Sequence, residues 1–194
     1  MAKLYFKYGT MESGKSTKII QEAYNYDRNN KSIIVAKPII DSKGNDKIVS
    51  RIGIQRKIDV YIESDNLKEI YEKINKETFC ILIDEAQFLN KNQVFELFKI
   101  TKLLEIPVMC YGLKSNFKGE FFEGSEALMI YADSLEEIVT ICSCGKKARF
   151  NARKVNGDFV TDGEDVLIDG SNESVEYVPL CGECYIKKVK KLQK

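Results

Sequence analysis

The sequence of 194 residues predicts an α/β fold in which a parallel sheet is flanked by helices. Short apolar runs of strand length alternate with amphipathic stretches through the first two thirds of the chain, as in folds with a parallel sheet. One run, residues 79–83 (FCILI), is continuously apolar, which is typical of a central strand covered on both faces. From Thr140 the character changes, because glycine and acidic residues accumulate between short β-like runs. We therefore expect a main domain, residues 1–139, and a small appendage, residues 140–194.

The first elements follow one another in the order strand, helix, strand, strand. Residues 3–8 (KLYFKY) form a short aromatic and apolar run that predicts a buried strand, and residues 17–26 are expected to form a helix. Residues 32–37 (SIIVAK) predict a second strand, which Pro38 closes. Residues 57–62 predict a third.

The later elements of the main domain continue this alternation. Residues 66–75 predict an amphipathic helix; the apolar side chains expected on one face are Leu67, Ile70, Tyr71 and Ile74. After the strand at 79–83, residues 92–104 are helical by periodicity. Residues 107–111 then predict another short buried strand.

Residues 9–17 (GTMESGKST) fit the phosphate-binding loop pattern GxxxxGK[ST] and lie between a predicted strand and a predicted helix. The glycines let successive backbone N–H groups turn toward an anion. Lys15 would reach the β- and γ-phosphates, and the Ser16 hydroxyl would bind magnesium. The alternative is a chance glycine turn before a helix. The main domain is therefore expected to be of the P-loop NTPase type; its predicted phosphate-binding residues are Gly9, Thr10, Met11, Glu12, Ser13, Gly14, Lys15 and Ser16.

An acidic pair, Asp84 and Glu85, directly follows the apolar strand at 79–83. Carboxylates at this edge of a parallel sheet face the phosphates in a P-loop enzyme. Asp84 would hold magnesium with Ser16, and Glu85 could take a proton from an attacking hydroxyl or water. Gln87 is assigned with Asp84 to the ATP-binding set. An acidic pair after a strand is by itself more often a helix cap, but the phosphate loop favours the catalytic interpretation.

The chain has six cysteines and no histidine, so a zinc site would be built from thiolates or carboxylates. Cys80 and Cys110 lie in apolar runs and are interpreted as small buried hydrophobic residues. The other four form a CxC and a CxxC pair and predict a structural zinc site: Cys142, Cys144, Cys181 and Cys184. A redox pair and unrelated free thiols are the alternatives. Zinc would tie together the ends of a long segment with little regular structure, which we expect to fold over a ligand as a lid.

Composition and charge bear on partners and location. The formal net charge of +1 gives no overall attraction to nucleic acid. The lysines at 187–194 are interpreted as a solvated helix or frayed tail. No apolar stretch approaches the length of a membrane span, and the chain begins with a strand in place of a signal peptide. We expect a cytosolic protein that binds neither nucleic acid nor membranes.

Taken together, these motifs resemble the type II thymidine kinases, a family of P-loop deoxynucleoside kinases. The matching segments span almost the whole chain in the family's order; they are residues 3–17, 50–53 (SRIG), 81–89 (ILIDEAQFL), 106–125, 140–148 (TICSCGKKA) and 177–185. This set is much more specific than the phosphate loop alone.

The resemblance implies transfer of the γ-phosphate of ATP to the 5′-hydroxyl of thymidine, with magnesium, to give dTMP and ADP. It gives Glu85 the role of catalytic base. The lid becomes a small zinc-binding lasso domain that covers the thymine; the nucleoside pocket would draw on Met11, Phe88, Leu113, Phe117 and Tyr177. A homotetramer and feedback inhibition by dTTP are also implied.

The chain departs from the family pattern in two places. Lys43 stands near the position where many relatives have an arginine after the second strand. In the lasso, Ile168-Asp169-Gly170 replaces the usual Ile-Gly-Gly, and the segment from there to Tyr177 is about three residues longer than in relatives. The fourth zinc ligand varies between histidine and cysteine in the family, so Cys184 is compatible with it.

Two other classes of protein remain open at this point. A P-loop ATPase that remodels nucleic acid would normally be larger than this chain, which shows no basic groove in its sequence. A zinc-ribbon module could bind nucleotide as a regulatory ligand without turnover. Replacement of Glu85 by glutamine would separate a kinase from such a module, because only the kinase depends on a base.

Overall fold

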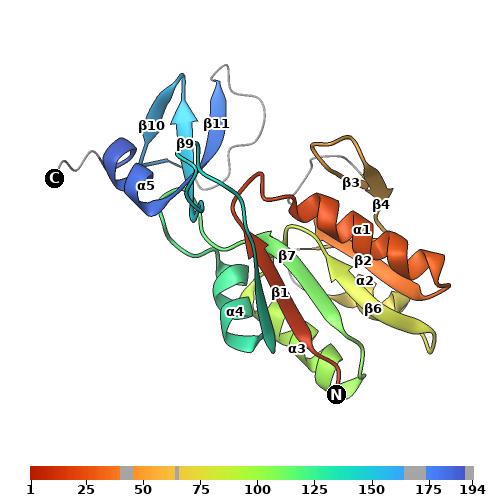
Figure 1. Cartoon of the computed structure of the whole chain (residues 1–194). Helices are drawn as coiled ribbons and strands as arrows, with labels where there is room; N and C mark the ends of the chain where they lie inside the picture. The colour runs from red at the N-terminus through yellow and green to blue at the C-terminus, as the bar shows by residue number, and fades with distance from the viewer. Residues whose placement is uncertain (40–45, 64–65, 164–173, 191–194) are drawn as a thin grey trace.

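The computed structural model describes residues 1–39, 46–63, 66–163 and 174–190. Six strands form one parallel sheet in the order β5-β2-β6-β7-β1-β8 (Figure 1). The strands of this sheet are β1 (Leu4–Gly9), β2 (Ser32–Pro38), β5 (Val60–Ile62), β6 (Thr78–Ile83), β7 (Val108–Leu113) and β8 (Ser134–Ile138). The predicted α/β class with a parallel sheet is confirmed.

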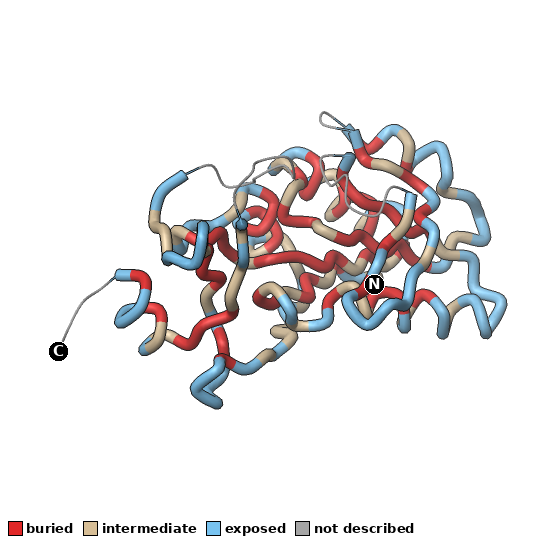
Figure 2. Tube along the Cα trace, turned by 90° about the horizontal axis from the view of Figure 1, so that it is seen from above, coloured by how far each residue is buried: buried red, intermediate tan, exposed pale blue. Residues whose placement is uncertain are grey.

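Helices cover both faces of the sheet, and the alternation of side chains along the strands explains why. In β6, Cys80 and Leu82 point into the core formed with α1, whereas Ile81 and Ile83 point into the core on the other face. The helices are α1 (Lys15–Arg28) on the first face and α2 (Lys68–Lys73), α3 (Lys91–Leu103) and α4 (Glu123–Tyr131) on the second. Figure 2 shows the buried stretches running along the central strands.

Several predicted elements differ in extent from the observed ones. Helix α1 begins at Lys15, directly after the loop, and is longer than the predicted helix 17–26. The strand predicted at 57–62 is interrupted at Asp59, whose side chain accepts a hydrogen bond from the Val35 N–H at 2.9 Å. Residues on either side of this interruption belong to different sheets. The prediction of one continuous strand there was wrong.

Two predicted apolar faces are less buried than expected. Phe79 is 44% exposed at the start of β6, so the central strand is covered on both faces only from Cys80 onward. Tyr71 is 41% exposed, and its hydroxyl donates to Glu96 at 2.9 Å across to α3. The phenol explains the exposure, because a hydroxyl at the rim of a core keeps a polar partner.

Residues 47–57 form a small antiparallel hairpin beside the phosphate loop, composed of β3 (Lys47–Val49) and β4 (Gln55–Lys57). We call it the β3–β4 hairpin. It projects above α1 at the same end of the sheet as the loop that follows β1 (Figure 1). Neither this hairpin nor helix α4 nor edge strand β8 was predicted from the sequence.

The C-terminal residues form a second unit with its own sheet and core, which we call the lid. Its antiparallel sheet has the order β10-β9-β11; the elements are β9 (Phe150–Val155), β10 (Asp158–Val160), β11 (Val175–Leu180) and helix α5 (Gly182–Lys188). Its core includes Cys142, Ala152, Leu180 and Tyr185. The expectation of little regular structure between the cysteine pairs was therefore wrong for β9 to β11. Lys43 and residues 168–170 lie outside the described residues.

Within the described residues, no helix has both the length and the apolar character that a membrane span requires.

Candidate active site

The phosphate loop leaves the end of β1 and closes against edge strand β8. A Cβ atom on Gly9 would lie 2.4 Å from Oγ of Ser13 and 2.6 Å from the carbonyl oxygen of Ile138, so only glycine fits there. Gly14, the residue that precedes α1, has a φ of 83°, a left-handed conformation that also favours glycine. The two glycines that the motif requires are thus the two positions where the backbone needs them.

The phosphate loop contains buried polar groups that could donate hydrogen bonds to an anion. The Lys15 side chain is only 8% exposed, and its Nζ donates to the Thr10 carbonyl oxygen at 2.8 Å. Burial lowers the pKa of Lys15, and the negative charges of Glu85 and Asp84 oppose that shift. The hydroxyls of Thr10 and Ser13 are buried and have no hydrogen-bond partner in the described part of the chain. A phosphate group would satisfy such donors.

The acidic pair lies at the end of β6, facing the same loop. Asp84 is 4% exposed. Glu85 has a φ of 50°, a left-handed conformation that is uncommon for a residue other than glycine and that clusters at functional sites. The structure therefore brings Lys15, Asp84 and Glu85 together in one wall of a cavity.

Gln87 lies behind Glu85 and is 2% exposed. Its Nε2 donates to the Glu85 carboxylate, and its Oε1 accepts from the backbone N–H of Leu113 at 3.0 Å. Gly112 makes room for it, because a Cβ atom there would lie 2.7 Å from Gln87 Oε1. The amide group thus joins the acidic pair to the end of β7. Its contact with the carboxylate was not foreseen from the sequence.

The cavity between the phosphate loop and the β3–β4 hairpin has a volume of about 410 Å³. Its walls come from the loop and the start of α1, from the acidic pair, from Leu113 and from hairpin residues 47–52. Arg51, at the turn of the hairpin, forms an ion pair with Glu12 of the phosphate loop. Arg51 belongs to the segment SRIG, which entered above only as part of the family resemblance, and no role was predicted for it.

The five residues predicted for the nucleoside pocket fall into three groups. Met11 and Leu113 line the 410 Å³ cavity. Phe88 makes an edge contact with Phe122, with ring centroids 5.9 Å apart. Phe117 and Tyr177 both contact the side chain of Arg153.

Arg153 of β9 connects the two remaining aromatic residues. Its guanidinium carbon lies 3.7 Å from the ring centroid of Phe117, and its Nε donates to the Tyr177 hydroxyl at 3.0 Å. The side chain is 1% exposed, so it is part of the structure between the lid and the main domain. A buried arginine stacked on one aromatic ring and bonded to a second fixes the relative position of both.

Asn151, two residues earlier on β9, connects the lid to the phosphate loop. Its Oδ1 accepts from the backbone N–H of Met11 at 2.7 Å, and its Nδ2 donates to the Ser115 carbonyl oxygen at 3.1 Å. Neither Asn151 nor Arg153 was predicted from the sequence to be a site residue. Their spacing of two on a strand would have placed both on one face, but nothing in the sequence showed that this face meets the phosphate loop.

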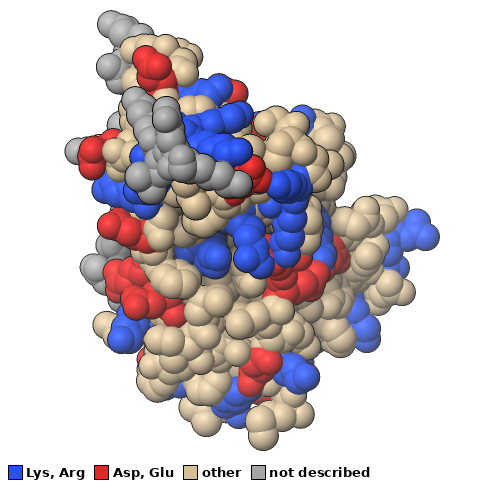
Figure 3. Space-filling view, turned by 60° about the vertical axis from the view of Figure 1, so that its left-hand side comes forward, with Lys and Arg blue, Asp and Glu red and all other residues tan. Residues whose placement is uncertain are grey.

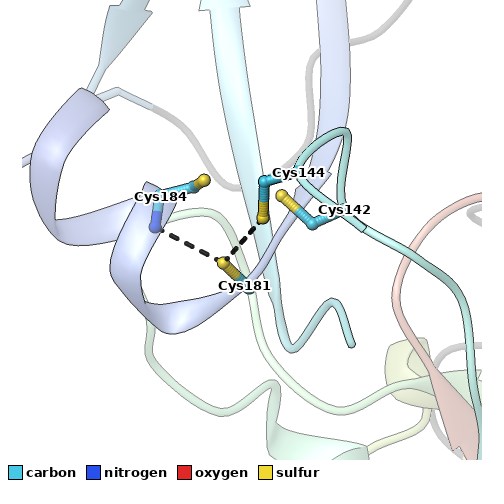
Figure 4. Close-up of side chains that lie close together, drawn as sticks. All are labelled: Cys142, Cys144, Cys181 and Cys184. Carbon is cyan, nitrogen blue, oxygen red and sulfur yellow. Dashed lines mark hydrogen bonds between the residues drawn. The ribbon is translucent and has the colours of Figure 1, made fainter. Parts of the chain in front are cut away.

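Four cysteines converge where the lid begins and ends (Figure 4). The sulfur atoms of Cys142, Cys144, Cys181 and Cys184 all lie within 4.8 Å of one another, and those of Cys144 and Cys181 are 3.5 Å apart. Tetrahedral zinc with bonds of about 2.3 Å needs sulfur atoms about 3.8 Å apart, so the cluster could hold a zinc ion. All six cysteines of the chain are free thiols, which leaves the four available as ligands.

The local folds of the two cysteine pairs explain this convergence. Gly145, with a φ of 84°, lets its N–H donate to the Cys142 carbonyl oxygen at 2.8 Å in a tight turn. Cys181 caps α5, and its sulfur accepts from the Cys184 N–H at 3.5 Å. Burial would raise the pKa of Cys142, but hydrogen bonds from the backbone of Cys144 and Cys181 and from neighbouring thiols outweigh it and lower that pKa to about 6. The thiolate form of Cys142, which is the form that binds metal, is thereby favoured.

The two remaining cysteines are buried in the main domain. Cys80 and Cys110 are fully buried, which confirms their interpretation as small hydrophobic residues. Burial raises the pKa of Cys80 to about 12 and raises that of Cys110 as well. Neither thiol is therefore a nucleophile at neutral pH.

Positive and negative side chains are interspersed over the face that Figure 3 shows. Lys and Arg side chains gather across its middle, and a group of acidic side chains borders them. This face thus carries no field of a single sign.

Comparison with known proteins covers nearly the whole chain. The family model described as thymidine kinase matches residues 2–185. A thymidine kinase from Mannheimia succiniciproducens is 45% identical over 196 residues, which cover 99% of each chain. One from Enterococcus faecalis is 43% identical over 187 residues, or 95% of each chain.

The chain belongs to the thymidine kinase family. The candidate site has two parts. The phosphate loop and acidic pair form one wall of the open cavity, and the aromatic residues joined by Arg153 lie where the lid meets the main domain. Met11 belongs to the first part and is bonded to the second through Asn151.

Proposed function

We propose that this thymidine kinase family member transfers the γ-phosphate of ATP to the 5′-hydroxyl of thymidine, and of deoxyuridine, to give dTMP or dUMP and ADP. The observation that carries this proposal is the common cavity wall formed by Lys15, Asp84 and Glu85. A phosphate-binding lysine and a carboxylate base on one surface are what phosphoryl transfer to a hydroxyl needs.

The phosphate loop provides most of the binding in this proposal. Backbone N–H groups of residues 9–16 and Nζ of Lys15 hold the β- and γ-phosphates, and the unpaired hydroxyls of Thr10 and Ser13 support an anion site there. Ser16 and Asp84 would hold magnesium, which neutralises charge on the phosphates when it is bound. Because the transferred group needs little covalent assistance, positioning and charge account for most of the rate.

Glu85 is the proposed catalytic base. It accepts the proton of the 5′-hydroxyl as the new oxygen–phosphorus bond forms, a contribution of about 10² to 10⁴ in rate. Gln87, which the sequence analysis assigned to the ATP-binding set, is instead proposed to orient the Glu85 carboxylate, since its Nε2 donates to it. Glu85 has a left-handed backbone just after the end of β6, and it lines the cavity.

We propose that thymidine binds between the main domain, residues 1–139, and the lid, residues 140–194. Its pocket would use Met11, Phe88, Leu113, Phe117 and Tyr177. A structural zinc ion on Cys142, Cys144, Cys181 and Cys184 would hold the two ends of the lid together. With four protein ligands that ion would have no open position for water, so it would not take part in the chemistry.

The family resemblance extends the proposal in three further respects. They are a homotetramer, feedback inhibition by dTTP, and a role in cytoplasmic salvage of pyrimidine deoxynucleosides for DNA synthesis.

The decisive experiment measures ADP release from ATP and magnesium with and without thymidine. Deoxycytidine and deoxyadenosine serve as parallel acceptors. Turnover that depends on thymidine or deoxyuridine supports the kinase, turnover without nucleoside indicates an ATPase, and no turnover indicates a nucleotide-binding module. Glu85→Gln should lower thymidine-dependent turnover by about 10² to 10⁴ while ATP still binds.

A further inference from the structure

Helix α5 connects the cysteine cluster to the main domain through one side chain, that of Tyr185. Cys181 caps this helix, and the backbone N–H of Tyr185 donates to the Cys181 carbonyl oxygen at 2.9 Å. The Tyr185 hydroxyl donates to the carbonyl oxygen of Phe117 at 3.1 Å in a buried hydrogen bond. One tyrosine thus joins the cysteine cluster of the lid to a residue of the proposed nucleoside pocket.

We propose that Tyr185 is a positioning residue for the nucleoside, because its hydroxyl holds Phe117 in place against the lid. This role rests on the proposed function, which makes Phe117 part of the thymidine pocket. Helix α5 thereby gains a part in nucleoside affinity that neither the motifs nor the family resemblance assigned to it.

The ring of Tyr185 is fixed by the core of the lid. It stacks on the ring of Phe150, the first residue of β9, with centroids 4.4 Å apart and an angle of 17° between the planes. Tyr185 is buried in the same core as Cys142 and Cys181, and Phe150 packs against that core. Stacked rings in a close-packed core keep one orientation. The place of the Tyr185 hydroxyl is therefore set by the lid and its cysteine cluster.

Phe117 receives a second contact from the lid, at its ring. The guanidinium carbon of Arg153 lies 3.7 Å from the centroid of that ring, whereas Tyr185 bonds to the backbone of the same residue. The two contacts come from different elements of the lid, β9 and α5. Because one holds the ring and the other holds the backbone, loss of the Tyr185 hydroxyl should let the Phe117 ring shift relative to Arg153.

Phe117 belongs to a compact loop, residues 114–122, which connects β7 to α4. The side-chain oxygen of Asn116 closes this loop, because it accepts from the backbone N–H groups of Lys118 at 3.0 Å and Glu120 at 2.9 Å. The Asn116 N–H also donates to the Glu120 carbonyl oxygen at 2.9 Å. A hydrogen bond to one carbonyl oxygen of such a closed loop positions the loop as a unit.

The contact between Tyr185 and Phe117 lies apart from the phosphate site. In the part of the chain that the structure describes, neither residue lines the 410 Å³ cavity beside the phosphate loop. The lid reaches that loop through Asn151, which accepts from the Met11 N–H. We therefore expect Tyr185 to affect the nucleoside and to leave ATP binding nearly unchanged.

The decisive variant is Tyr185→Phe, because it removes the hydroxyl and keeps the ring that stacks on Phe150. The Phe117 carbonyl oxygen loses its donor in a buried place, so we expect the Kd for thymidine to rise about tenfold. The KM for ATP should change less than about twofold, and kcat at saturating thymidine less than about threefold. Calorimetry measures the Kd, and steady-state kinetics separate KM from kcat.

The matched control is Tyr111→Phe, in the main domain. Tyr111 is also buried, and its hydroxyl donates to Glu22 of α1. Its loss should lower the free energy of unfolding, as measured by denaturant titration, at least as much as Tyr185→Phe does, and leave thymidine affinity unchanged. The proposal is overturned if Tyr185→Phe binds thymidine as tightly as the unmodified enzyme, if it weakens thymidine and ATP equally, or if its effect on thymidine is no larger than that of Tyr111→Phe.

The proposed function and the role of Tyr185 can fail separately. If the unmodified enzyme binds thymidine without thymidine-dependent turnover, the transfer reaction is wrong, but the Kd values still decide the role of Tyr185. If turnover is present and Tyr185→Phe keeps its affinity for thymidine, the kinase proposal stands and Tyr185 is only part of the lid core. An unmodified enzyme that binds neither thymidine nor deoxyuridine would overturn both.

Discussion

The side-chain oxygen of Asn151 accepts a hydrogen bond from the backbone N–H of Met11 at 2.7 Å, so the lid is bonded directly to the phosphate loop. Its amide nitrogen donates to the Ser115 carbonyl oxygen at 3.1 Å on the other side. One buried side chain from β9 therefore connects three segments that are distant in sequence. The position of the lid and the shape of the phosphate loop are coupled through it.

The first prediction concerns this connection. Asn151→Ala removes both hydrogen bonds and leaves the groups they satisfied without a partner, so we expect a loss of about 1 to 3 kcal/mol in the free energy of unfolding. The KM values for ATP and thymidine should both rise several-fold, because the hydrogen bonds of Asn151 hold the phosphate loop and the lid in their relative positions. Denaturant titration and steady-state kinetics measure the two effects.

The control for that variant is Asn156→Ala. Asn156 also lies in the lid, but its side chain accepts from the Ser174 N–H at 3.2 Å within the lid itself. It should leave the KM for ATP unchanged. An Asn151 variant with an unaltered KM for ATP would contradict the coupling.

A second prediction concerns the pH dependence of ATP binding. Burial lowers the pKa of Lys15 in the free enzyme, and bound phosphates would raise it again by favouring the charged amine. As pH rises through the lowered pKa, the free enzyme loses this positive charge, so ATP affinity should fall and binding should take up a proton. Calorimetry in two buffers of different ionisation enthalpy measures the uptake at increasing alkaline pH.

Lys15→Arg is the control for the proton uptake. Arginine stays charged over the alkaline pH range of this experiment. Any ATP binding that remains in this variant should therefore cause no proton uptake by the side chain at position 15. Equal proton uptake in both proteins would show that another group titrates.

A third prediction concerns the amide that contacts the proposed base. Gln87→Leu removes the donor to Glu85 and the acceptor for the Leu113 N–H, so the carboxylate loses its fixed orientation. We expect kcat to fall about tenfold or more, with the KM for ATP changed much less. Steady-state kinetics separate the two constants.

Gln93→Leu is a suitable comparison for Gln87→Leu. Gln93 is also a buried amide, but it completes the capping box of α3 and donates to the Glu63 carbonyl oxygen at 2.6 Å. Its loss should lower stability and leave kcat nearly unchanged. If both variants lower kcat in proportion to stability, Gln87 has no specific role at the base.

The fourth prediction concerns the cysteine cluster. Cys181→Ser, or a strong chelator, should release zinc and loosen the lid, because Cys142 and Cys181 are part of its core. The KM for thymidine should rise about tenfold or more, while ATP still binds to the phosphate loop of the main domain. Elemental analysis gives the zinc content, and limited proteolysis reports the loosening.

Cys80→Ala distinguishes the cluster from a general effect of losing a thiol. Cys80 is buried in β6, apart from the other sulfur atoms, so this variant should keep its full zinc content. An enzyme that contains no zinc before treatment would contradict the assignment of the cluster as a metal site.

The fold class could be predicted because its signals are local. A phosphate loop between a strand and a helix, and an apolar run that is followed by Asp84 and Glu85, each occupy a few consecutive residues. Cysteine spacing likewise indicated the cluster whose sulfur atoms lie together. The phosphate loop needs glycine for its backbone shape, and the metal cluster needs cysteine for its ligands. Few other residue types meet these requirements, so both patterns can be found from the sequence.

The elements that the sequence did not predict depend on contacts between distant residues. Strand β8 is short and polar (SLEEI) because it lies at the edge of the sheet, beside β1. The roles of Asn151 and Arg153 require the lid to pack against the main domain, which no local pattern specifies. Arg51 reaches the phosphate loop only because the hairpin folds back over it.

The position of residue 1 bears on how the enzyme can be attached to a support. Strand β1 begins at the far end of the sheet from the phosphate loop, and Met1 is 92% exposed there (Figure 1). An affinity tag or fluorescent label at this end would lie away from both proposed substrate sites. A label joined after α5 would instead be carried by the lid, so it would suit measurements of lid movement better than immobilisation.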